Sequence, residues 1–206
     1  MPHTKRSQEK ITPDEVLEQL REGNKRFITA NTLDRDYYKK IKKYANGQYP
    51  MAIILNCIDS RTSAEIIFDQ GIGDIFSVRI AGNILNSDIL GSMEFACAVA
   101  GAKLILVLGH SNCGAVQGAI DSVKMGNLTG LLDKLHPAID AIPPFDGEKS
   151  SKNAEYMQKV ADMNVLLTRE RVRKESAILR EMEESGQIKI VGGMYDLSTG
   201  EVEFFE

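Results

Sequence analysis

Short apolar runs alternate with amphipathic stretches through the middle of the chain. Two runs, 51–57 and 103–109, are short and almost uninterrupted, as is typical of buried strands, and 74–80 is a further strand candidate. Amphipathic stretches that predict helices lie between and after these runs: 59–70, 87–100 and 115–123. Strands and helices that alternate in units of this length predict a parallel sheet with right-handed crossovers.

The N-terminal part of the chain has a different character. Residues 1–11 are polar and predict a flexible tail, and Thr12, Pro13 and Glu15 then give the signal for the start of a helix. Residues 34–46, rich in Tyr and Lys, predict a second helix with little apolar surface. A core built from the later residues leaves little room for both helices. We therefore expect residues 12–46 to form an arm that packs on a partner chain.

The C-terminal part completes the predicted fold. Residues 127–147 indicate a helix and a loop, and residues 151–184 indicate a long charged helical region. Residues 187–197 and 201–205 flank a short turn and predict a hairpin. The prediction is a single α/β domain over residues 12–206. It has a central, mainly parallel β-sheet flanked by helices, an N-terminal helical arm and a C-terminal edge strand or hairpin.

The composition argues against a nucleic-acid-binding protein and against a membrane-spanning one. The 206 residues include 25 Lys and Arg against 29 Asp and Glu, so there is no basic excess for binding nucleic acid. No apolar run reaches the roughly 18 residues that a membrane helix needs. The three cysteines cannot all pair in disulfides, which favours a reducing compartment. We expect a cytoplasmic protein with no nucleic-acid or membrane partner.

Candidate chemistry follows two of the apolar runs. Cys57 ends the first run, and His110 and Cys113 lie just past the run 103–109. The carboxyl ends of parallel strands form the ligand crevice of such sheets. Two thiolates and one imidazole are a set that zinc takes when a fourth position is kept open.

Simpler interpretations exist for each piece of this pattern. A cysteine at the end of a strand is often just a small buried residue, and Asp59 with Ser60 resembles a helix N-cap. The segment GHSNCG (109–114) could form a phosphate-binding turn. The joint pattern, rather than any single residue, favours the metal site.

The string CIDSR (57–61), followed by GHSNCG (109–114), resembles the paired signature of β-class carbonic anhydrases. The resemblance runs from about residue 12 to the end of the chain. It implies one Zn²⁺ per chain, bound by Cys57, His110 and Cys113, with Asp59 and Arg61 as a catalytic dyad beside the metal. It further implies reversible hydration of carbon dioxide to bicarbonate and a proton by zinc-bound hydroxide, at an open, plant-type active site. The expected assembly is a homodimer or a dimer of dimers.

The same resemblance implies a carbon dioxide pocket to which both subunits contribute. Its matching positions are Gln48, Phe76, Ala81 and Phe95. Phe95 stands where the family commonly has Tyr, and Ala81 stands where a larger aliphatic residue is usual. We interpret Arg79 as a helix-capping or interface charge.

Two other functions fit parts of the pattern. Hydrolysis of carbon disulfide or carbonyl sulfide would use the same zinc site, so the motif alone does not separate it from carbon dioxide hydration. A non-catalytic zinc-binding or nucleotide-binding module is the second alternative. An open ligand position beside Asp59 and Arg61 argues against a purely structural site, which would use a fourth protein ligand. Cys97 lies among apolar residues and is interpreted as core.

Overall fold

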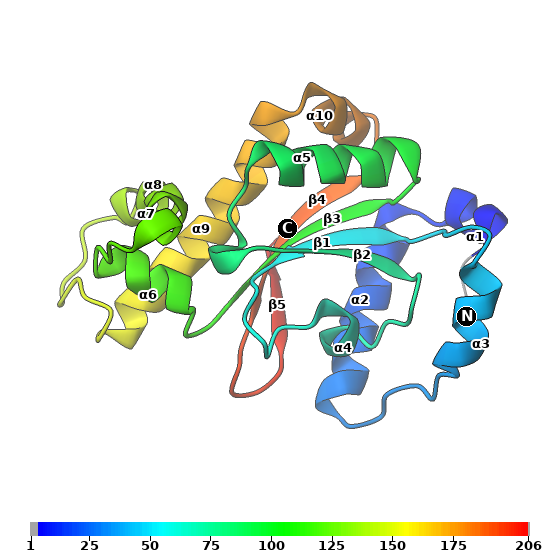
Figure 1. Cartoon of the computed structure of the whole chain (residues 1–206), viewed down its shortest axis with the longest axis horizontal. Helices are drawn as coiled ribbons and strands as arrows, with labels where there is room; N and C mark the ends of the chain where they lie inside the picture. The colour runs from blue at the N-terminus through cyan, green and yellow to red at the C-terminus, as the bar shows by residue number, and fades with distance from the viewer. Residues whose placement is uncertain (1–3, 206) are drawn as a thin grey trace.

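The computed structural model describes residues 4–205, in which a central sheet is covered by helices on both faces (Figure 1). Within these residues the sheet has five strands in the order β2-β1-β3-β4-β5. The strands are β1 (Ala52–Asn56), β2 (Ile75–Arg79), β3 (Leu104–His110), β4 (Lys189–Tyr195) and β5 (Val202–Phe205). All neighbours pair in parallel except β4 and β5, which form an antiparallel hairpin at the edge. The predicted fold class and its C-terminal hairpin are confirmed.

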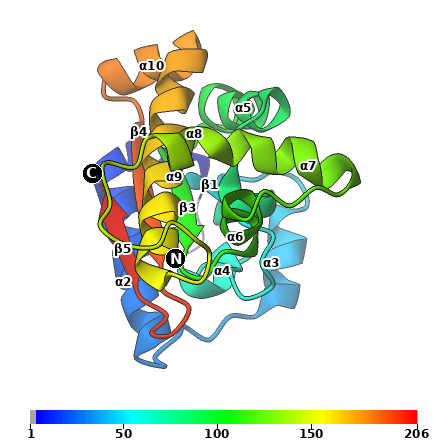
Figure 2. The same ribbon diagram turned by 90° about the vertical axis from the view of Figure 1, so that its left-hand side faces the viewer.

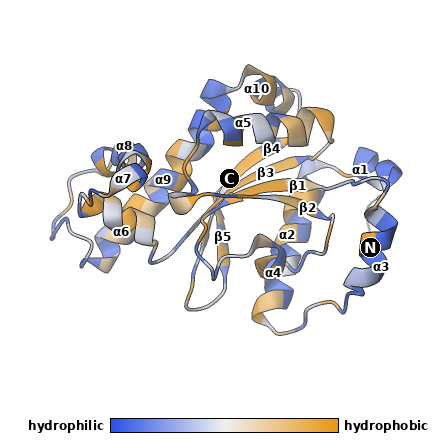
Figure 3. Ribbon diagram, in the orientation of Figure 1, coloured by the Kyte–Doolittle hydropathy of each residue, from blue (hydrophilic) through white to orange (hydrophobic). Residues whose placement is uncertain are grey.

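The inner strands are hydrophobic because both of their faces are buried. Every residue of β1 and β3 is buried, and successive side chains point to opposite faces. Ile54 therefore packs in the core on one face, whereas Ile53 and Leu55 pack in the core on the other. Figure 3 shows this as hydrophobic strands at the centre of the molecule.

Two layers of helices bury these faces. The first layer contains α2 (Pro13–Ile28) and α4 (Ala64–Ile67), below the sheet in Figure 1. The second contains α5 (Ser87–Glu94), α9 (Ala154–Glu175) and α10 (Ala177–Glu184). The long charged region predicted over 151–184 is thus two helices, broken at Ser176, whose hydroxyl caps α10.

A group of shorter helices follows β3 and lies beside α9. These are α6 (Gly114–Ile120), α7 (Gly126–Leu132) and α8 (His136–Asp140), with a 3₁₀ turn over Asp133–Leu135 between the last two. Figure 2 shows the three helices on the side of the molecule that faces the viewer. No helix in the part of the chain that the structure describes is both long and apolar enough to cross a membrane.

The expectation of a flexible tail over residues 1–11 is wrong for residues 4–11. The helix α1 (Lys5–Lys10) forms there, and Thr4 caps it through a reciprocal bond with Ser7. The buried side chain of Gln8 donates hydrogen bonds of 2.8 Å to the carbonyls of Pro50 and Ala100. These contacts anchor the helix to the ends of two distant elements. Residues 1–3 lie outside the described part.

The two helices of the predicted arm behave differently. Val16, Leu17 and Leu20 of α2 are buried in the core beneath the sheet, so the argument that this helix lacks room in its own chain is wrong. In contrast, α3 (Tyr37–Tyr44) has no buried residue among those described. Its Lys40 pairs with Asp74 at 2.7 Å, which ties α3 to the loop before β2.

Candidate metal centre

Cys57 lies directly after β1, at the start of a tight turn. The Thr62 hydroxyl donates to the carbonyls of Cys57 and Asp59, at 3.1 and 2.9 Å. Arg79, the last residue of β2, donates from Nε to the Cys57 carbonyl at 2.9 Å and from Nη2 to the Asp59 carbonyl at 2.5 Å. These bonds occupy backbone groups that a helix would use. The helix predicted over 59–70 is therefore wrong for its first part, and only the short helix α4 forms.

His110 and Cys113 reach the same place from the end of β3. His110 is the last residue of the strand, and Cys113 is the residue that precedes α6. Between them Asn112 has a φ of 53°, a left-handed conformation that asparagine tolerates better than most residues. This turn lets both side chains of one loop point toward Cys57.

The three side chains form a buried cluster with the geometry of a metal site. Cys57, His110 and Cys113 are 4%, 1% and 2% exposed, and their ligand atoms all lie within 4.8 Å of one another. Ligands of tetrahedral zinc lie about 3.5–3.8 Å apart, so a small adjustment would close the cluster around an ion.

The orientation of the His110 ring supports the same conclusion. Its Nδ1 lies 2.8 Å from the Ser111 carbonyl, which can only accept a hydrogen bond, so Nδ1 carries a hydrogen. In the neutral ring Nε2 then carries the lone pair, and this buried nitrogen has no hydrogen-bond partner within residues 4–205. A buried acceptor without a partner is costly unless a ligand satisfies it. A metal ligand oriented in this way is typical of histidines held by an outer hydrogen bond.

The two thiols share a proton in the metal-free cluster. The hydrogen bond from Cys113 is the main cause that lowers the pKa of Cys57; burial acts against it, and the His110 side chain and the backbone N–H groups of Asp59 and Gly82 act with it. The same bond raises the pKa of Cys113, and burial raises it further. Cys57 is thus ready as a thiolate, the form that binds metals.

Asp59 and Arg61 form an ion pair beside the cluster. Arg61 donates from Nε to Oδ1 at 2.9 Å and from Nη2 to Oδ2 at 2.7 Å, and its backbone N–H also donates to Oδ1 at 3.0 Å. These hydrogen bonds hold the pKa of Asp59 well below its usual range. The carboxylate is therefore ionised at neutral pH.

The predicted pocket residues fall into two groups within one chain. Ala81 begins the 3₁₀ turn Ala81–Asn83, whose Gly82 N–H donates to Cys57 Sγ at 3.4 Å, so Ala81 lies near the metal cluster. Phe76 is instead in register with Ile53, four residues before Cys57, which is about 13 Å along the strand. It therefore lies away from the cluster.

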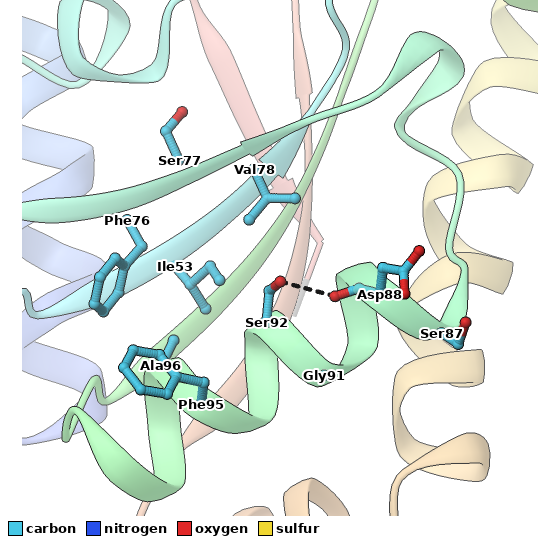
Figure 4. Close-up of a pocket in the computed structure, with 10 residues that line it drawn as sticks. All are labelled: Ile53, Phe76, Ser77, Val78, Ser87, Asp88, Gly91, Ser92, Phe95 and Ala96. Carbon is cyan, nitrogen blue, oxygen red and sulfur yellow. Dashed lines mark hydrogen bonds between the residues drawn. The ribbon is translucent and has the colours of Figure 1, made fainter.

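Phe76 and Phe95 line a groove of about 490 Å³ between β2 and α5, shown in Figure 4. Their rings pack edge to face, with centroids 6.4 Å apart, and Phe95 is 51% exposed. Phe95 begins a π-helical turn, Phe95–Val99, that continues α5. Gln48 lies in the exposed loop before β1, at the opposite end of that strand from Cys57. Within one chain, Gln48, Phe76 and Phe95 are thus not brought to the metal cluster.

Arg79 and Thr62, which hold the site together, are not among the predicted site residues. Arg79 was interpreted as a cap or an interface charge, but it fixes the backbone that carries Cys57 and Asp59. Thr62 was not singled out. The available signal was the register of the strands: Arg79 pairs with Asn56, so it lies beside the residue before Cys57.

The fold and the cluster together define an α/β protein with a metal-binding Cys–His–Cys set at the carboxyl end of its sheet. The family described as "Carbonic anhydrase" matches residues 52–202. Among curated proteins, "Carbonic anhydrase 2" of Mycobacterium tuberculosis is 37% identical over 187 residues, which cover 88% of this chain and 87% of that protein. The chain belongs to the carbonic anhydrase family, in its β class.

Solved structures give the same fold. The β-carbonic anhydrase CcaA superposes with a TM-score of 0.72 at 22% identity, covering 94% of this chain and 86% of that one. A β-carbonic anhydrase of Sordaria macrospora, described as tetrameric, gives a TM-score of 0.67 at 25% identity, covering 81% and 89%. The protein is an enzyme that uses zinc to hydrate carbon dioxide reversibly to bicarbonate and a proton.

Proposed function

We propose that Cys57, His110 and Cys113 bind the catalytic zinc, one ion per chain, and that Asp59 and Arg61 act on the reacting water. The observation that carries the ligand assignment is the buried Nε2 of His110, which has no partner among the described residues while its ring lies against two thiols. Zinc at such a site lowers the pKa of water to about 7 and so supplies hydroxide at neutral pH.

Asp59 orients the reacting water in this proposal. Its ionised carboxylate can accept a hydrogen bond from the water and so point an oxygen lone pair toward carbon dioxide. Arg61 keeps the carboxylate charged and directed by its two-point contact. Since both oxygens of Asp59 are engaged by Arg61, the arrangement supports an open metal position rather than one closed by this carboxylate.

A second copy of the chain would complete the substrate pocket. Phe76 and Phe95 offer an apolar wall suited to a gas, and Gln48 offers an amide for bicarbonate, yet all three lie away from the metal cluster of their own chain. The tetrameric relative from Sordaria macrospora supports self-association. We propose at least a homodimer in which these residues face the partner's metal site.

The segment that follows α2 is the part of the predicted arm that suits such an interface. Tyr37, Tyr38 and Ile41 of α3 are all more than half exposed. Because α2 belongs to the core of its own chain, the proposed dimerisation segment is limited to α3 and its flanking loops. A reducing location such as the cytoplasm fits the site, since Cys57 and Cys113 bind zinc only as free thiolates and both are free here.

The test of the ligand assignment compares single cysteine variants. Cys57→Ala and Cys113→Ala should each lose zinc and the hydration activity together. Cys97→Ala is the matched control, because Cys97 is equally buried but packs in a separate core cluster. Zinc content by elemental analysis and hydration by stopped flow would be measured on the same samples. Full zinc occupancy in either ligand variant would refute the assignment.

A further inference from the structure

Asn164 is a buried polar residue on α9 that faces the loops of the metal site. It is 4% exposed, and its Nδ2 donates a hydrogen bond of 2.9 Å to the carbonyl of Gly82. Apolar neighbours of Asn164 on the same helix, Val160, Ala161 and Val165, pack in the cluster that contains Cys57 and Cys113. The helix α9 therefore packs against the metal site, and Asn164 is the residue of this helix that hydrogen-bonds to the loop after β2.

Gly82 lies in a turn with an unusual backbone. Gly82 and Asn83 have φ angles of 67° and 41°, both in the left-handed region. A side chain at Gly82 would also be crowded, because a Cβ there would lie 3.1 Å from Leu135 and 3.2 Å from Ala115. A turn of this kind needs external contacts to hold one conformation.

The conformation of this turn directs a backbone donor at a sulfur atom. The N–H of Gly82 lies 3.4 Å from Cys57 Sγ, within hydrogen-bond range for sulfur. Two links thus connect the helix to the site: Asn164 binds the carbonyl of Gly82, and the amide of the same residue binds Cys57.

We propose that Asn164 is a positioning residue of the zinc site, which holds the Gly82 turn so that its N–H donates to the Cys57 sulfur. This inference rests on the proposed role of Cys57 as a zinc ligand. A donor directed at a thiolate fixes the position of the sulfur and the charge that it places on the metal. Outer hydrogen bonds of this kind are typically worth 10-fold to 100-fold in metal affinity.

The test replaces the amide and compares it with a neighbouring position. Asn164→Leu removes the donor and keeps the same number and branching of side-chain heavy atoms, and Asn164→Asp keeps the shape but cannot donate to the carbonyl when ionised. Thr168→Val is the matched control, because Thr168 lies one turn further along α9 and is 2% exposed. Zinc dissociation constants would be measured by competition with a chelator. The thiolate-to-metal charge-transfer absorption would be recorded on cobalt-substituted protein, together with the thermal midpoint of each metal-free variant.

We expect both Asn164 variants to weaken zinc binding ~10-fold or more and to shift the cobalt charge-transfer band. Thr168→Val should change neither, even where its thermal midpoint falls by a similar amount. An unchanged zinc constant and band in a folded Asn164 variant would overturn the inference. Equal losses in Asn164→Leu and Thr168→Val would also overturn it, since they would reflect general loosening of α9.

A further variant separates this inference from the assignment of the ligands. Cys57→Ala, recorded with enough cobalt to keep its weakened site loaded, should lose the part of the charge-transfer band that comes from its sulfur. If Cys57→Ala keeps the full band, the ligand assignment itself fails. If Cys57→Ala loses it while Asn164→Leu matches the wild type, the ligand assignment stands and only the role of Asn164 is refuted.

Discussion

Arg61 holds Asp59 at both carboxylate oxygens, with Nε 2.9 Å from Oδ1 and Nη2 2.7 Å from Oδ2. The two residues are separated by one position, and the turn between Cys57 and Thr62 brings them face to face. A carboxylate held in this way has one charge state and one orientation. This pair therefore provides a fixed acceptor beside the metal cluster.

Replacing Asp59 by Asn should leave the metal in place and slow the reaction. The amide keeps the shape of the side chain but lacks the negative charge that makes the carboxylate a strong acceptor for a hydrogen bond from the water. We expect the rate of hydration to fall ~10²-fold or more, as is common when a positioned proton acceptor is lost. Stopped-flow rates and zinc content together would check this. A nearly normal rate would mean that Asp59 only supports the turn.

The pKa of Asp59 itself should depend on Arg61. Hydrogen bonds from Arg61 are the first cause of the lowered pKa. In Arg61→Ala the pKa of Asp59 should rise toward its ordinary value of about 3.9. The carboxylate then remains ionised at pH 7, so a loss of rate at that pH would report lost orientation rather than lost charge. Titration of the Asp59 carboxyl carbon by NMR would measure the shift, and equal values in both proteins would contradict this account.

Asp69 should make a pH-dependent contribution to stability. It accepts hydrogen bonds from Arg26, at 2.5 Å, from Arg35 and from the backbone of Leu33. Burial raises the pKa of Asp69, but the bonds from Arg35 and Arg26 outweigh it and the pKa is lowered overall. Asp69→Asn should lower the free energy of unfolding by about 3 kcal/mol at pH 7, since both arginines lose their partner.

The sign of the pH effect follows from the direction of this shift. A carboxyl group whose pKa is lower in the folded protein stabilises it above the unfolded pKa, which is about 3.9 for Asp. That stabilisation is lost as the pH falls toward the folded value. The difference in stability between wild type and Asp69→Asn should thus be constant near neutral pH and shrink below about pH 4. Urea unfolding at several pH values would test this, and a difference that grows on acidification would contradict it.

The groove around Phe95 should matter for activity only through a second chain. Phe95→Asp should reduce hydration ~10-fold or more while zinc remains bound, because it places a charge in the proposed shared pocket and weakens self-association. Met125→Asp is the control, since Met125 is more exposed than Phe95 and lies elsewhere, directly before α7. Sedimentation should find the wild type as a dimer or larger. A fully active monomer at nanomolar concentration would contradict the proposal.

The hydrophobic pattern and the short motifs of the sequence were sufficient to predict the sheet and the cluster of metal ligands. The apolar runs at β1 and β3 predict buried strands, and because the carboxyl ends of parallel strands meet at one edge of the sheet, Cys57 is expected close to His110 and Cys113, as the structure shows. Thr12 and Glu15 likewise form the predicted reciprocal cap of α2. Each of these features depends on neighbours in the sequence or on strand order.

Features decided by distant contacts could not be predicted. Arg79 reaches across from β2 to hold the turn after Cys57, which replaces the helix expected there. Gln8 anchors α1 through carbonyls 42 and 92 residues away. Asn164 acts over a comparable separation, since it binds a residue 82 positions earlier in the chain. A polar side chain that satisfies a remote backbone group leaves no periodic pattern in the sequence.

X-ray absorption at the zinc edge is the most direct test of the central claim, that Cys57, Cys113 and His110 bind the metal. On the zinc-loaded protein we expect two sulfur ligands at about 2.3 Å and two nitrogen or oxygen ligands at about 2.0–2.1 Å. Cys113→Ala, if it retains any zinc, should show one sulfur ligand. A wild-type spectrum that requires no sulfur, or four sulfur ligands, would contradict the account.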